Sequence, residues 1–117
     1  MEKGFYTHTE ILSQPEAWAQ ALEVVKQARQ PLAPILLAQY SQILFTGCGS
    51  TYYLSLAAAA LFQELTGRVA RAVPGGELLL NPDTVLSGGN TLLVAISRSG
   101  STTETVRAVE RFNNPKV

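Results

Sequence analysis

Apolar residues follow two different patterns along this chain, one over the first 40 residues and another over the rest. After Pro15, apolar positions are spaced four and three residues apart, which predicts an amphipathic helix. Because Pro31 and Pro34 cannot donate backbone hydrogen bonds, we expect this helix to end near Gln30. Residues 35–40 then form a second short helix, so two helices precede the first strand.

Beyond residue 40, short unbroken apolar runs alternate with helical segments. The run at 43–46 is bounded by turn residues and is typical of a strand buried on both faces. Residues 69–73 and the apolar run at 91–97 are expected to form two further strands. Residues 51–66 are rich in Leu and Ala without Pro or Gly, which predicts a helix. Gly67 stands where a left-handed cap would close it.

Two further helical segments complete the pattern. Residues 77–80 are expected to form one helical turn, and a longer helix is expected to run to about Phe112. Ser101 and Glu104 have the spacing of a capping box, which predicts that this helix starts near Ser101. A turn at residues 113–115 follows, and the sequence stops where a fourth strand would begin.

The alternation of strand and helix predicts right-handed crossovers and a parallel sheet covered by helices on both faces. We therefore expect a three-layer, flavodoxin-like α/β fold with strand order 2-1-3, truncated after its third βα unit. Residues 1–40 are expected to form an N-terminal helical segment, and residues 41–117 the first part of the α/β domain.

Composition narrows the class of protein. The 117 residues include nine Lys and Arg against nine Asp and Glu, and this neutral balance argues against nucleic-acid binding. The longest apolar run, residues 56–62, is far below the ~20 residues that span a bilayer, so no membrane partner is expected.

With one cysteine and no secretory signal, a cytoplasmic location is expected. One Cys and one His supply no structural zinc site, and we expect no cofactor.

Small polar residues with glycine follow two of the predicted strands. We call residues 47–51 the first loop and residues 97–102 the second loop; each leads into a predicted helix. A helix N-terminus exposes unpaired N–H groups and favours anions, and glycine lets an anion approach the backbone. In a 2-1-3 sheet the two strands are neighbours, so both loops should face one crevice and form a phosphate site.

Other phosphate-binding and catalytic motifs do not fit. A P-loop requires a lysine, and none occurs between Lys26 and Lys116. A dinucleotide fingerprint starting at Gly47 would have Tyr52 at its third glycine position, and no acidic residue ends the second strand. Ser99 lacks the flanking glycine pattern of a hydrolase nucleophile.

Residues 46–52 and 96–105 resemble the two phosphate-binding motifs of the sugar isomerase (SIS) domain family. Residues 10–15 resemble the Glu-Ile-x-x-Gln-Pro entry of one branch. That branch includes the isomerase half of glutamine–fructose-6-phosphate aminotransferase, tagatose-6-phosphate ketose/aldose isomerase relatives and fructosamine-6-phosphate deglycases. Arg98 and Ser101 replace a Gln and a Glu common in the aminotransferase, which favours the isomerase and deglycase members.

The resemblance implies which residues hold the phosphate. They are Gly49, Ser50 and Thr51 of the first loop, and Ser97, Arg98, Ser99 and Thr102 of the second. Cys48 is interpreted as a small buried residue rather than a reactive thiol.

The resemblance also implies the partner and the function. The ligand is expected to be a phosphorylated sugar or amino sugar, bound as part of an aldose–ketose isomerase, aminotransferase-isomerase or deglycase. The chain offers no good catalytic base, and in this family such groups lie in later parts of the polypeptide. Two alternatives are a sensing module that binds a phosphosugar without turnover and a structural remnant without a ligand.

Uncovered strand edges and apolar helix faces predict a homo-oligomer, with a dimer as the simplest form.

Overall fold

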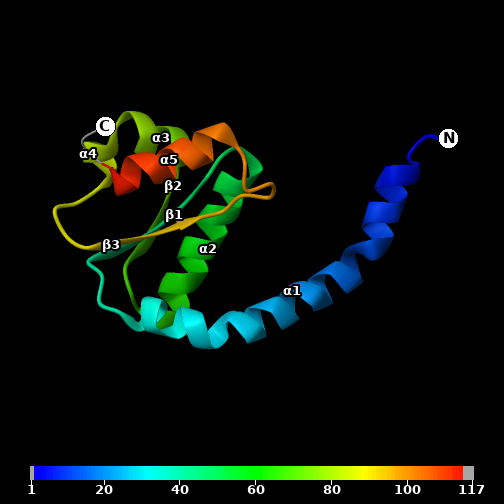
Figure 1. Ribbon diagram of the computed structural model, residues 1–117, viewed down its shortest axis with the longest axis horizontal. Coiled ribbons are helices and arrows are strands. Elements are labelled where there is room, and N and C mark those ends of the chain that lie inside the picture. The colour runs from blue at the N-terminus through cyan, green and yellow to red at the C-terminus, as the bar shows by residue number, and fades with distance from the viewer. Residues whose placement is uncertain (1, 115–117) are drawn as a thin grey trace. The chain divides into compact units, whose positions relative to one another are not determined.

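The computed structural model describes residues 2–114, which form two compact units that divide between Ala38 and Gln39 (Figure 1). The first unit contains one helix, α1 (Phe5–Leu37), of 33 residues, and none of its residues is buried.

Helix α1 differs from the two helices predicted for this segment. It continues through Pro15, Pro31 and Pro34 without ending. Proline costs a helix one hydrogen bond and bends it, but its fixed φ is compatible with helical geometry. Because α1 is exposed, water can solvate the carbonyl groups left without a backbone partner. The break predicted near Gln30 is therefore wrong.

The second unit is an α/β domain. Its elements follow the order β1 (Gln42–Gly47), α2 (Ser50–Thr66), β2 (Ala70–Pro74), α3 (Gly75–Leu80), α4 (Pro82–Val85), β3 (Thr91–Ala95) and α5 (Thr103–Asn113). The three strands form a parallel sheet in the order β2-β1-β3, which confirms the predicted topology. Helix α2 closes at Gly67, whose φ of 68° confirms the predicted left-handed cap.

The central strand β1 separates two apolar clusters, because successive side chains of a strand point to opposite faces. Ile43 and Phe45 pack with Ala59 of α2 on one face. Leu44 packs on the other with a cluster of Val73, Leu78, Val85 and Ala108, drawn from β2 and α3 to α5. Figure 1 shows α2 on one side of the sheet and α3 and α5 on the other, so the three expected layers are present.

All of β1 is buried, as a central parallel strand should be. The turn predicted at residues 113–115 lies partly outside the described residues. Within residues 2–114, no helix is both long and apolar enough to cross a membrane.

Candidate functional site

The first loop needs glycine at two positions for different reasons. Gly49 has φ 61° and ψ −123°, a conformation that side chains rarely adopt, although nothing lies within 4 Å of where a Cβ would be. Gly47 faces the opposite constraint, since a Cβ there would lie 2.6 Å from the Thr51 hydroxyl oxygen. The positive φ of Gly49 turns the chain, and the missing side chain of Gly47 leaves room for Thr51 in the first turn of α2.

Thr51 holds the first loop closed. Its hydroxyl donates to the Cys48 carbonyl and its oxygen accepts from the Cys48 N–H, both at 2.9 Å. The hydroxyl proton of Thr51 is thus used inside the loop. Any contact of Thr51 with a ligand is better made by its backbone N–H.

The first turn of α2 offers donors to an anion. The amides that open a helix have no acceptor within it, and no side chain caps this end. Ser50 is exposed, and its hydroxyl has no hydrogen-bond partner among residues 2–114. These groups lie at the carboxyl end of β1, where ligands of doubly wound folds bind.

The second loop is shaped by its own serines. Gly100 has φ 70°, its N–H donates to the Ser97 hydroxyl oxygen at 3.0 Å, and the Ser101 N–H donates to Ser99 Oγ at 3.2 Å. Ser99 Oγ also lies 3.5 Å from Thr102 Oγ1. The Ser97 hydroxyl oxygen accepts its bond, so the Ser97 proton remains available for an anion, whereas Ser99 and Thr102 share one hydrogen bond in which either hydroxyl can donate.

Helix α5 begins at Thr103, with Thr102 as its N-cap residue and no side-chain cap. The predicted capping box between Ser101 and Glu104 is therefore wrong. The Glu104 carboxylate instead accepts a hydrogen bond from Cys48 Sγ in the first loop at 3.0 Å. Glu104 thus pairs with a residue distant in the sequence instead of with the start of its own helix.

This contact shifts the pKa of the Cys48 thiol. Its hydrogen bond to Glu104, burial, and the negative charge of Glu104 together raise the pKa of the thiol above its ordinary value. A raised pKa lowers the fraction of thiolate, which is the reactive form of a cysteine. The residue is partly exposed rather than fully buried.

Arg98 extends from the exposed part of the second loop. No ion pair or hydrogen bond of its guanidinium is present within the described part of the chain. Its charge is therefore available to a ligand.

The structure brings the two loops to one edge of the sheet. β1 pairs directly with β3, with Thr46 opposite Ala95, and the Ile96 N–H continues the pairing by donating to the Thr46 carbonyl at 2.8 Å. The Cys48–Glu104 bond then joins the first loop to the helix that follows the second. The predicted adjacency of the loops is thus present in the fold.

A hollow of about 310 Å³ lies beside the second loop. Ser97 and Gly100 line it together with residues of β3 and α5, and none of its lining residues comes from the first loop. Thr105 also lines it; this residue is 4% exposed, and its hydroxyl has no hydrogen-bond partner in the described chain. Thr105 was not among the predicted site residues, although it is the last residue of the 96–105 motif.

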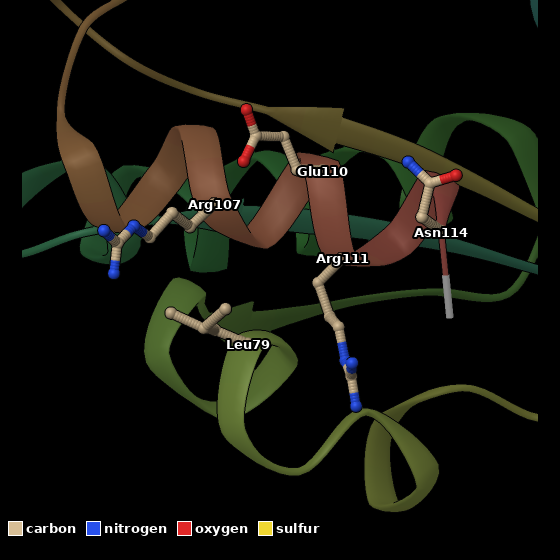
Figure 2. Close-up of a pocket in the computed structure, with 5 residues that line it drawn as sticks. All are labelled: Leu79, Arg107, Glu110, Arg111 and Asn114. Carbon is tan, nitrogen blue, oxygen red and sulfur yellow. The ribbon is translucent and has the colours of Figure 1, made fainter. Parts of the chain in front are cut away.

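A second hollow, of about 400 Å³, contains none of the predicted site residues (Figure 2). Leu79 of α3, three residues of α5 and the residue that caps its C-terminus line it: Arg107, Glu110, Arg111 and Asn114. In Figure 2 the Arg111 side chain extends toward α3 and α4, whereas Glu110 points toward β3. This hollow is separate from the two loops.

The fold and the loops define a class of protein: a parallel α/β domain with two helix N-termini at the carboxyl edge of adjacent strands. The family model of the SIS domain matches residues 36–117. The chain belongs to the SIS domain family.

Individual relatives agree with this assignment. The chain is 33% identical over 115 residues to a putative D-galactosamine-6-phosphate deaminase, AgaS, of Escherichia coli K12, covering 94% of this chain and 30% of that protein. It is 37% identical over 114 residues to glutamine–fructose-6-phosphate aminotransferase (isomerizing) of Pyrococcus horikoshii, covering 93% of this chain and 18% of that protein. A deaminase was not among the activities expected from the sequence.

A solved structure has the same fold. The crystal structure of tagatose-6-phosphate ketose/aldose isomerase from Escherichia coli matches with a TM-score of 0.84 and 33% identity, over 92% of this chain and 31% of that one. The chain thus spans less than a third of the length of each of these relatives.

Proposed function

We propose that this chain binds the phosphate group of a phosphorylated sugar or amino sugar at its two loops. The parent activity would be of the isomerase, aminotransferase-isomerase, deglycase or deaminase type. The placement of both loops at one edge of the sheet carries this proposal, because each loop leads into the N-terminus of a helix of at least 11 residues. The names of the relatives, all of which refer to sugar 6-phosphates, give independent support.

The proposed contacts use backbone and hydroxyl donors more than charge. Gly49, Ser50 and Thr51 present the opening amides of α2, and Ser50 adds its free hydroxyl. Ser97, Ser99 and Thr102 add hydroxyl donors from the second loop, and Arg98 adds the one positive charge of the two loops. This distribution fits a neutral chain that recognises a phosphate dianion.

Binding is the part of the function that these residues support. Moving a proton between adjacent sugar carbons needs a free base. Glu104 is the carboxylate that contacts the first loop, and it is hydrogen-bonded to Cys48. The proposal therefore assigns no catalytic residue within this chain, and a sensing role without turnover remains the alternative.

Calorimetric titration of the 117-residue chain tests the proposal. Fructose 6-phosphate, tagatose 6-phosphate and galactosamine 6-phosphate should bind, whereas the same sugars without phosphate should bind at least about tenfold more weakly, since charged hydrogen bonds are lost. Equal affinity for both sets would refute phosphate recognition. Turnover of any of these ligands would exclude the sensing alternative.

An arginine pair gives a matched control for this titration. Arg98→Ala should weaken phosphosugar binding by roughly 3- to 10-fold, because an exposed guanidinium–phosphate contact is lost. Arg107→Ala removes the same charge from the exposed surface of α5, outside both loops, and should leave the affinity unchanged. Equal losses in both variants would indicate a general charge effect instead of a contact.

We further propose that the chain acts in the cytoplasm as a homodimer. Apolar side chains along α1 support self-association: Trp18, Leu22 and Val25 are each more than 60% exposed. Light scattering behind a sizing column should give twice the monomer mass of 12.6 kDa. Replacing Trp18 and Leu22 by Ser should shift the chain toward the monomer, and a monomeric wild type would contradict the dimer.

A further inference from the structure

Three segments that are distant in sequence converge on the carboxylate of Glu104. Oε2 accepts the hydrogen bond from Cys48 Sγ at 3.0 Å, which links α5 to the first loop. Oε1 faces the start of α3, where a Cβ built on Gly76 would lie 2.8 Å from it. The side chain also passes Gly75, whose own Cβ position lies 3.5 Å from the Gly47 carbonyl oxygen.

Gly76, the second residue of α3, fits this arrangement. Neither Gly75 nor Gly76 has a positive φ, so backbone conformation does not explain them. A side chain at Gly76 would occupy the space that Glu104 Oε1 uses. The absence of a side chain at this position thus lets the carboxylate reach the first loop.

The contact lies where the two proposed halves of the phosphate site meet. Glu104 is the second residue of α5, two positions after the second loop, and Cys48 lies between the two glycines of the first loop. Cys48 also exchanges both of its backbone hydrogen bonds with Thr51, so a displacement of Cys48 moves the start of α2. The position of one helix N-terminus is thereby tied to that of the other.

We propose that Glu104 is a positioning residue of the phosphosugar site, holding the first loop and the N-terminus of α5 at the separation that one phosphate group requires. This inference rests on the proposed function. Glu104 itself does not contact the phosphate, whose negative charge its carboxylate would repel; it acts through Cys48.

The single cysteine makes the contact measurable without a ligand. Cys48 is the only thiol in the chain, so alkylation by iodoacetamide reports on this side chain alone. Because thiolate is the reactive form, the pH dependence of the alkylation rate gives the pKa of Cys48. Glu104 is the only ionisable residue that contributes to its raised pKa.

Two substitutions from different segments should disturb the contact in the same way. Glu104→Gln removes the charge, and Gly76→Ala pushes Oε1 away while adding a better helix former to α3. Each should move the alkylation midpoint to lower pH and weaken fructose 6-phosphate binding by roughly 3- to 10-fold. Gly76→Ala should do so without lowering the melting temperature, which separates positioning from general destabilisation.

Neighbouring residues supply the controls. Gly75→Ala places a Cβ at ordinary contact distances of 3.5 Å or more, so both the midpoint and the affinity should stay as in the wild type. Glu64→Gln removes an exposed charge from α2 and should also have no effect.

The outcomes separate the two proposals. If the wild type shows no preference for fructose 6-phosphate over fructose, the proposed function fails and the positioning role falls with it. If the wild type prefers the phosphosugar but both variants keep its affinity, only the positioning role is overturned. An unchanged alkylation midpoint in both variants overturns the contact itself.

Discussion

Replacing Thr51 by Val removes the hydrogen bonds that close the first loop while keeping the shape of the side chain. In the wild type the Thr51 hydroxyl exchanges two hydrogen bonds of 2.9 Å with the backbone of Cys48. Valine at this position leaves the partly buried N–H and the carbonyl of Cys48 without these partners. An unsatisfied group of this kind costs about 1–3 kcal/mol.

The loss should appear in stability and in binding. Each kcal/mol lowers the melting temperature of a domain of this size by roughly 4–8 °C, so thermal unfolding followed by circular dichroism will resolve it. Affinity for fructose 6-phosphate should fall as well, since the first loop no longer holds the opening amides of α2 in place. Thr51→Ser keeps the hydroxyl and should retain both properties to a large extent.

The serine variant decides between packing and hydrogen bonding. Valine fills the same space as threonine, whereas serine lacks the methyl group but keeps the donor and acceptor. If Thr51→Val is as stable as the wild type, or if Thr51→Ser is equally destabilised, the hydroxyl does not hold the loop and the reasoning is refuted.

The sheet could be predicted from the sequence because its signals are local and strong. The apolar runs that became β1, β2 and β3 are each bounded by glycine, proline or polar turns, and Gly67 marks the end of α2. The alternation of strand and helix then leaves few possible topologies. The edge of the sheet that carries both loops followed from that topology.

The sequence predictions that are wrong rest on patterns of neighbouring residues, and interactions that these patterns do not report decided the structure there. The spacing of Ser101 and Glu104 satisfies the capping-box pattern, but the partner of Glu104 is Cys48, 56 residues earlier in the chain. Pro31 and Pro34 predict the end of a helix, although the exposed helix α1 tolerates the carbonyl groups that they leave without a backbone partner. The unpaired hydroxyl of Thr105 depends on burial, which no local pattern reports.

Three further substitutions test individual parts of the structure. Gly49→Ala should reduce stability by about 1–3 kcal/mol and weaken phosphosugar binding, because φ 61° with ψ −123° is strained for any side chain; unchanged unfolding and binding would contradict this. Leu78→Ala should lower the free energy of unfolding in urea by about 2–5 kcal/mol, because the Leu78 side chain of α3 is 0% exposed in the apolar cluster around Leu44. A loss below about 1 kcal/mol would contradict its place in the core. Thr105→Val should raise the unfolding free energy by about 1 kcal/mol by removing a buried hydroxyl without a partner, and a clear loss of stability would show that the hydroxyl is satisfied.

Nuclear magnetic resonance mapping of ligand binding tests the central claim most directly. Backbone amide shifts of the labelled 117-residue chain would be followed during titration with fructose 6-phosphate, and again with fructose. We predict saturable shifts for fructose 6-phosphate at residues 49–51 and 97–102 together, and much smaller shifts for fructose. Shifts that are confined to other surfaces, or that are equal for both sugars, would contradict a phosphate site built from the two loops.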